Sequence, residues 1–79
     1  MAQVLKAHSS LSLEMRDALK LLVGQEGYRS WAGSFINGTP VRTPTIRALI
    51  RRELVEEWRA PSGTWRFSLT KLGRDVVEG

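Results

Sequence analysis

The stretch TPTIRALIRREL, which spans residues 43–54, contains the strongest helical pattern in the chain. Its apolar residues recur at the spacing that forms one face of an α-helix: Ile46, Leu49, Ile50 and Leu54. We expect Thr43 to cap this helix and Pro44 to occupy its first position, where the missing N–H group costs nothing. The pattern therefore predicts a helix over residues 43–52, with small polar residues and arginines opposite the apolar stripe.

The residues before this stretch predict another helix, over residues 10–23. The apolar positions again mark one helical face: Leu11, Met15, Ala18, Leu19 and Leu22. Ser10 or Ser12 can cap this helix, and Gly24 can end it. Residues 1–9 are then expected to form a flexible tail, and residues 10–79 a single domain.

Residues 24–42 lose the helical periodicity, because glycines and a proline interrupt them. A short helix lined by Trp31, Phe35 and Ile36 is the preferred interpretation, with Asn37-Gly38 at its end. The alternative is a tight type I′ turn at Asn37-Gly38 between two very short strands.

Residues 54–69 predict a β-hairpin, because Ala60-Pro61-Ser62-Gly63 is a turn cluster between segments rich in aromatic and β-branched residues. If the loop has four residues, Arg59 pairs with Thr64. A register that contains a β-bulge is the alternative. The four-residue loop also pairs Trp58 with Trp65, Glu57 with Arg66, and Leu54 with Leu69. One face of the hairpin would then meet the helices through Leu54, Trp58, Trp65, Phe67 and Leu69. A short terminal helix is expected over residues 70–77, interrupted by Gly73.

The composition narrows the classes of function. The chain of 79 residues has no cysteine and one histidine, His8, so disulfides, thiolate metal sites and histidine clusters are excluded. No glycine-rich phosphate loop or catalytic triad is visible, so we expect neither an enzyme nor a cofactor. No small-molecule ligand is evident. The N-terminus lacks a secretory signal and no run is long enough to span a membrane, so a cytoplasmic location is expected.

The positive charge of the chain is clustered. The net charge is +4, and six arginines fall within 25 residues: Arg42, Arg47, Arg51, Arg52, Arg59 and Arg66. A basic helix with small residues on its leading face can enter the major groove of DNA, where arginine pairs with guanine or phosphate. Double-stranded DNA is therefore the expected partner.

Three stretches carry a resemblance to a known family. Residues 41–49, VRTPTIRAL, resemble the recognition helix of bacterial MarR-type and phage-type regulators. Residues 51–56, RRELVE, are similar to the family's exit pattern RRGLVE, and residues 67–74, FSLTKLGR, to the pattern vxLTxxGR that follows its wing. The resemblance implies an α+β winged helix-turn-helix with about three helices, a C-terminal hairpin wing and a short terminal helix. It also implies DNA binding and transcriptional control.

The chain departs from this family in three details. The segment that should hold the second helix is glycine-rich and carries extra residues, and the loop of the wing is short. The short wing is expected to contribute phosphate contacts at most. Glu53 stands where the family usually has glycine, which predicts a helix exit without a positive φ angle.

The expected DNA contacts come from the helix and the wing. The helix would contribute Arg42, Thr43, Thr45, Arg47, Ala48, Arg51 and Arg52, and the wing Arg59, Ser62, Thr64 and Arg66. The alternative for single arginines is an ion pair on the surface: Arg47 with Glu57, and Arg51 or Arg52 with Glu56. The alternative function is a protein-interaction or dimerisation module in a larger phage or chromosomal assembly. A homodimer is possible, through residues 10–23 or the chain ends.

Overall fold

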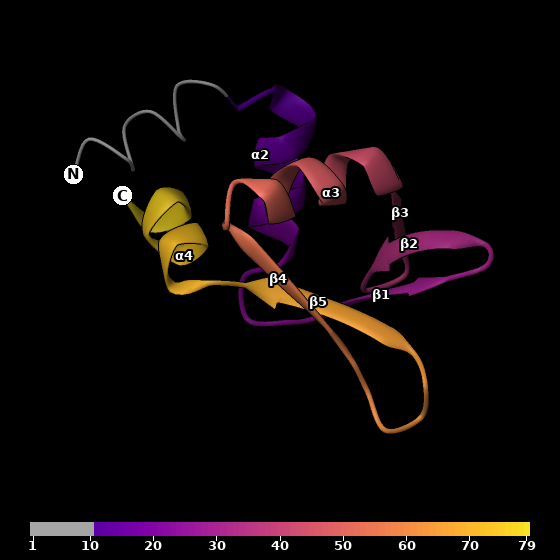
Figure 1. The fold of residues 1–79 in the computed structure, drawn as a ribbon. Helices are drawn as coiled ribbons and strands as arrows, with labels where there is room; N and C mark the ends of the chain where they lie inside the picture. Colours follow the sequence, from indigo (N-terminus) through magenta and orange to yellow (C-terminus); the bar gives the residue numbers. More distant parts are fainter. Residues whose placement is uncertain (1–10) are drawn as a thin grey trace.

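The computed structural model describes residues 11–79, which form an α+β fold (Figure 1). The expected tail and His8 lie outside the described residues. The described elements are α2 (Leu13–Leu21), β1 (Gly27–Ser30), β2 (Gly33–Ile36), β3 (Thr39–Val41), α3 (Thr43–Arg51), β4 (Val55–Arg59), β5 (Trp65–Leu69) and α4 (Lys71–Glu78). The five strands form one antiparallel sheet in the order β3-β2-β1-β5-β4.

The first described helix follows the expectation closely. Ser12 is the N-cap of α2, and its hydroxyl accepts a hydrogen bond from the backbone N–H of Met15 at 3.2 Å. The apolar face buries Met15, Ala18 and Leu19. Periodicity and the capping serine therefore located this helix, which is shorter than the predicted range 10–23.

The helix preferred within residues 24–42 is wrong, and the alternative of short strands is correct. Asn37 and Gly38 have φ angles of 50° and 78° and connect Ile36 to its partner Thr39, as in a type I′ turn. In β2 the alternation buries Ser34 and Ile36. The extra residues of this segment therefore enlarge the sheet instead of forming a second helix.

Helix α3 begins at Thr43, so its N-cap lies one residue before the predicted cap, and Pro44 occupies the second helical position instead of the first. The N-cap is Arg42, which makes no side-chain capping bond. The hydroxyl of Thr43 instead lies 2.9 Å from that of Ser34 in β2. The first turn of α3 is therefore tied to the sheet by a hydrogen bond between two side chains.

The exit from α3 contradicts the expectation for Glu53, whose φ angle is +61°. The N–H of Leu54 donates to the carbonyl of Leu49 at 3.0 Å, and the N–H of Glu53 donates to that of Ile50 at 2.9 Å. These two bonds form a Schellman motif, in which the residue after the C-cap is left-handed. Leu54 is fully buried. The chain must reverse its direction at residue 53 to bury it, although that residue is glutamate and not glycine.

Replacement of Glu53 by glycine is expected to stabilise the protein. A left-handed residue with a Cβ atom costs about 1–2 kcal/mol, whereas glycine adds a smaller entropic cost, about 0.4–1 kcal/mol, in the unfolded chain. Urea unfolding should therefore show a net gain of roughly 0.5–1 kcal/mol for Glu53→Gly. Glu53→Ala removes the same charge but keeps Cβ, so an equal gain for both variants would contradict the explanation from backbone strain.

The predicted hairpin exists, but its register differs by one residue. Arg59 pairs with Trp65, Trp58 with Arg66, and Val55 with Leu69. Ala60 and Thr64 are joined by a hydrogen bond of 2.8 Å, so the loop has three residues rather than four. Val55 therefore shares a face with Phe67 and Leu69, while Trp58 lies on the opposite face.

The last helix is continuous through Gly73, contrary to the expected interruption. Thr70 is its N-cap: the hydroxyl accepts from Gly73 N at 3.0 Å and donates to the carbonyl of Glu53 at 2.6 Å. The N–H of Thr70 donates to the carbonyl of Leu54 at 3.1 Å. We call these contacts of Thr70 and Gly73 with residues 53–54 the clasp, because they join the start of α4 to the exit of α3.

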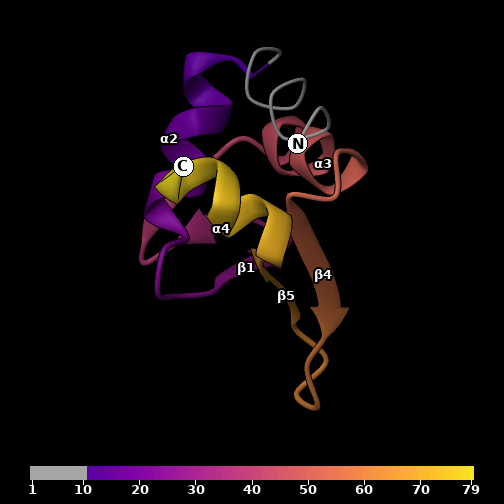
Figure 2. The same ribbon diagram turned by 90° about the vertical axis from the view of Figure 1, so that its left-hand side faces the viewer.

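The core lies between the helices and one face of the sheet. This inner face contributes Ile36, Val55 and Phe67, each at most 2% exposed, against apolar residues of all three described helices. Figures 1 and 2 show α2, α3 and α4 gathered together, with the β4–β5 hairpin extending away from them. The outer part of that hairpin therefore lies beyond the core.

Candidate nucleic-acid interface

The outward face of α3 presents two exposed arginines. Arg47 and Arg51 lie one helical turn apart, with exposed Pro44 beside them. The opposite face buries Ile46 and Leu49. Packing of α3 on the core therefore places both arginines on the solvent-exposed side of the helix.

Neither arginine is engaged in an ion pair within residues 11–79. Glu57, which was considered as an ion-pair partner of Arg47, instead accepts a hydrogen bond from Arg29 Nε at 3.2 Å. Glu56 is exposed and forms no ion pair with a described arginine. The surface ion pairs considered for Arg47 and Arg51 are therefore not formed.

Three other predicted residues of this helix do not face outward as expected. Thr45 is 7% exposed, and its hydroxyl donates to Glu14 Oε2 of α2 at 3.0 Å. Arg52 is half-buried and donates from Nη1 to the carbonyl of Ala48 at 3.4 Å. Ala48 itself is half-buried. Because α2 packs against this side of α3, the buried face of α3 extends to Thr45. The periodicity of one helix cannot reveal a contact with another helix.

The N-terminal end of α3 adds another basic side chain. Arg42 is 72% exposed at its side chain, and its Nη1 lies 3.7 Å from Glu14 Oε2. An ion pair this exposed contributes little to stability and is readily exchanged. Glu14 thus contacts both Thr45 and Arg42, and it helps to position the start of α3 against α2.

The wing residues divide between the two faces of the sheet. Arg59 is exposed, and its Nε donates to the carbonyl of Gly63 at 3.3 Å. Ser62 and Thr64 bond to each other at 3.2 Å beside the turn. Arg66 lies on the face opposite Arg59, where its Nη1 is 3.6 Å from Glu26 Oε1. The predicted wing set is therefore not one surface.

Sequence reasoning missed a cluster on the inner face beyond the core. The guanidinium of Arg29 lies 5.5 Å from the centre of the Trp65 ring and also pairs with Glu57. Trp65, expected in the core, is 39% exposed, and Trp31 at the β1–β2 turn is fully exposed. The pairing of β1 with β5 brings Arg29 to Trp65, and no local sequence signal indicates that pairing.

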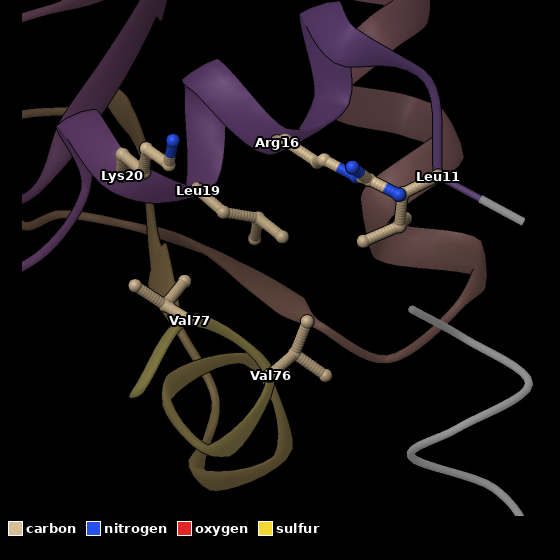
Figure 3. A pocket seen from close by; sticks show the side chains of 6 residues that line it. All are labelled: Leu11, Arg16, Leu19, Lys20, Val76 and Val77. Atoms are coloured by element: carbon tan, nitrogen blue, oxygen red, sulfur yellow. The ribbon is translucent and has the colours of Figure 1, made fainter. Parts of the chain in front are cut away.

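A small apolar cleft separates α2 from α4 (Figure 3). Leu11, Leu19, Val76 and Val77 line it, with Arg16 and Lys20 on the side of α2. Its volume is about 70 Å³, whereas sites for small molecules usually enclose roughly 300–1,000 Å³. Since no residue of α3 lines this cleft, it is separate from the arginine face.

Two further features of residues 11–79 concern metals and membranes. No three metal-ligating side chains gather among them, and none of their helices combines the length and apolarity of a membrane span.

Comparisons of this chain with models of protein families, with curated proteins and with solved structures found no match.

Proposed function

We propose that the protein binds double-stranded DNA through α3, as a sequence-specific transcriptional regulator of prokaryotic or phage type. The exposed pair Arg47 and Arg51 carries the proposal, because both guanidinium groups are free of ion pairs within the described chain. Arginine on a helix in the major groove can pair bidentately with guanine or bind phosphate. Arg42 and the N-terminal end of α3 add attraction for phosphate.

The order of elements supports a winged-helix variant. A helix, α3, leads directly into the β4–β5 hairpin, and β5 pairs with β1, which follows α2. In a winged helix-turn-helix, a middle helix would stand where this chain has β2 and β3. The proposed reading element is therefore α3 with Arg42, Arg47 and Arg51, while Arg59 in the wing contacts phosphate.

The proposed interface is narrower than the set expected from sequence. Thr45 is omitted because it is buried, and Arg66 because it lies on the other face of the sheet. Thr43 bonds to Ser34 of β2 and Ala48 packs against the core, so both position the helix, whereas Arg52 bonds within the helix. Ser62 and Thr64 shape the turn beside Arg59.

Loss of Arg47 and Arg51 is expected to weaken DNA binding and reduce its dependence on salt. Each phosphate contact contributes roughly 0.9 to the slope of log K against log salt concentration. The double variant Arg47→Ala/Arg51→Ala should therefore lower the slope by up to about 1.8, measured by fluorescence anisotropy with random duplex DNA. A further loss of affinity on the preferred site would report base contacts, worth about 1–3 kcal/mol for each bidentate pair.

The matched control removes two positive charges from a different helix. Lys71 and Arg74 are exposed on α4, so Lys71→Ala/Arg74→Ala has the same net charge as the α3 variant. We expect its slope to stay close to that of the unmodified protein. Equal effects of the two double variants would locate the binding surface outside α3, and absence of binding at low salt would refute DNA binding altogether.

A second candidate function is protein interaction. The observation that favours it is exposed aromatic surface away from α3, namely Tyr28 and the fully exposed Trp31. Absence of binding to duplex DNA at low salt, in the same titrations, would favour this second candidate.

A further inference from the structure

A row of cationic and aromatic side chains crosses the inner face of the sheet beside the start of α3. Residues directly opposite each other in an antiparallel sheet share a face. The register pairs Ser34 with Arg29, Arg29 with Trp65, and Trp65 with Arg59. Ser34 bonds to Thr43 in the first turn of α3. We call Arg29, Trp65 and Arg59 the inner row, because they lead from that helix toward the tip of the hairpin.

The inner row is a part of this face that α3 leaves uncovered. The side chain of Arg29 is 31% exposed and Trp65 is 39% exposed, and Arg59 is exposed. Ser34, beside α3, is buried. Figures 1 and 2 show none of the described helices over the outer part of the β4–β5 hairpin. The inner row is therefore open to a partner on the side of the sheet where α3 lies.

The guanidinium of Arg29 is held in place, but most of its N–H groups have no acceptor. Its Nε donates to Glu57 Oε2 at 3.2 Å, and its Cζ atom lies 5.5 Å from the centre of the Trp65 ring. Within residues 11–79, Nη1 and Nη2 of Arg29 make no hydrogen bond. The carboxylate and the ring therefore orient a guanidinium whose two terminal amino groups can still donate.

An arginine of this kind is suited to phosphate. The planar guanidinium offers two parallel N–H groups at the spacing of two phosphate oxygens. A side chain that its neighbours already hold loses less conformational entropy when it binds a partner. The inner row has two arginines, whereas one acid, Glu57, lies beside it, with 23% of its side chain exposed. An anionic partner therefore fits this surface.

We propose that Arg29 is a further phosphate contact of bound duplex DNA, with Trp65 and Glu57 as the residues that position its guanidinium. The inference rests on the proposed function and extends the interface from α3 onto β1. One strand spacing, about 4.8 Å, separates Arg29 from Ser34 at the start of α3, and two spacings separate it from Arg59. Arg29 thus connects the arginines of α3 and the wing arginine into one surface.

The test compares two arginines on opposite faces of the sheet. Arg29→Gln removes the proposed contact, whereas Arg66→Gln removes an arginine from the outer face, which is the face opposite the core. Each arginine has one carboxylate partner, so each variant loses one charge and leaves one acid unpaired. In fluorescence anisotropy of the full chain with random duplex DNA, Arg29→Gln should lower the slope of log K against log salt concentration by about 0.9. Arg66→Gln should leave the slope unchanged.

Trp65→Leu tests the positioning role, because it removes the ring under Arg29 without changing the charge. The freed arginine should lose affinity for DNA by roughly two- to tenfold, the entropic cost of ordering one side chain again. The salt slope should stay the same. Urea unfolding verifies that each variant is folded in the titration buffer. Unchanged affinity in the folded variant would refute the positioning role.

The outcomes separate this inference from the proposed function. Equal slopes for Arg29→Gln and Arg66→Gln, with a lower slope for Arg47→Ala/Arg51→Ala, would overturn the role of Arg29 and leave DNA binding through α3 intact. Absence of binding by the unmodified protein at low salt would overturn both.

A second measurement applies if Arg29→Gln does not fold. In the variant Trp31→Phe/Trp58→Phe, Trp65 is the one remaining tryptophan of the chain, so its fluorescence reports on the inner row alone. Duplex DNA bound at Arg29 should shield this ring and reduce its quenching by acrylamide. Undiminished quenching in the bound state would overturn the contact.

Discussion

Replacement of Gly73 by alanine is expected to destabilise the protein by about 3–5 kcal/mol, among the largest effects of a single methyl group. An added Cβ atom would overlap the carbonyl oxygen of Leu54 and would lie 3.0 Å from its carbon and 3.2 Å from Leu69 Cδ2. The oxygen belongs to the backbone and already accepts the N–H of Thr70, so it cannot move without breaking the clasp. A domain of this length has only roughly 4–12 kcal/mol of stability in total.

Urea unfolding followed by circular dichroism measures this effect. The matched control is Gly38→Ala, where an added Cβ meets no atom within 4 Å but the φ angle is +78°. It should cost only about 1 kcal/mol, because it introduces backbone strain without a clash. A similar loss in both variants would mean that the clasp yields easily and that the contact of Gly73 with Leu54 is unimportant.

The second large effect is expected for Gly27→Ala, in the middle strand of the sheet. The new Cβ would overlap the ring of Phe67 and lie 2.9 Å from the carbonyl oxygen of Phe35. Phe67 is completely buried, so its ring has no free space to enter. We expect a loss of about 2–4 kcal/mol from this overpacking.

A double-mutant cycle separates the ring contact from the backbone contact. Phe67→Leu removes the ring atoms that the new methyl group would meet, so Gly27→Ala should cost less in the Phe67→Leu background than in the unmodified protein. The coupling energy is expected to reach about 1–2 kcal/mol, as for residues in direct contact. Additive losses, obtained by urea unfolding, would assign the cost to the carbonyl of Phe35 instead.

The elements that were predicted correctly are those specified by neighbouring residues. Helix α2 has its cap at Ser12, and α3 has an apolar stripe that runs through Ile46 and Leu49. The hairpin was located by its turn residues. In each case the determining groups lie within a few positions of one another along the chain.

The errors arose where distant segments decide the structure. Strands β1, β2 and β3 have only three or four residues each, too few for a convincing alternation, and β1 depends on its pairing with β5. A loop one residue shorter than assumed moved Trp58 to the outer face. In the candidate site, Arg47 and Arg51 were predicted from one helix, whereas burial of Thr45 depends on Glu14 of another.

The clasp affects how far a shared sequence pattern can be taken as evidence of a shared partner. Leu69, Thr70 and Gly73 are the named positions of the LTxxG pattern, and in this molecule they close the fold around Glu53 and Leu54. Natural selection on folding alone would preserve them. The presence of this pattern in the chain is therefore explained by folding alone, and it carries no information about what Arg47 and Arg51 bind.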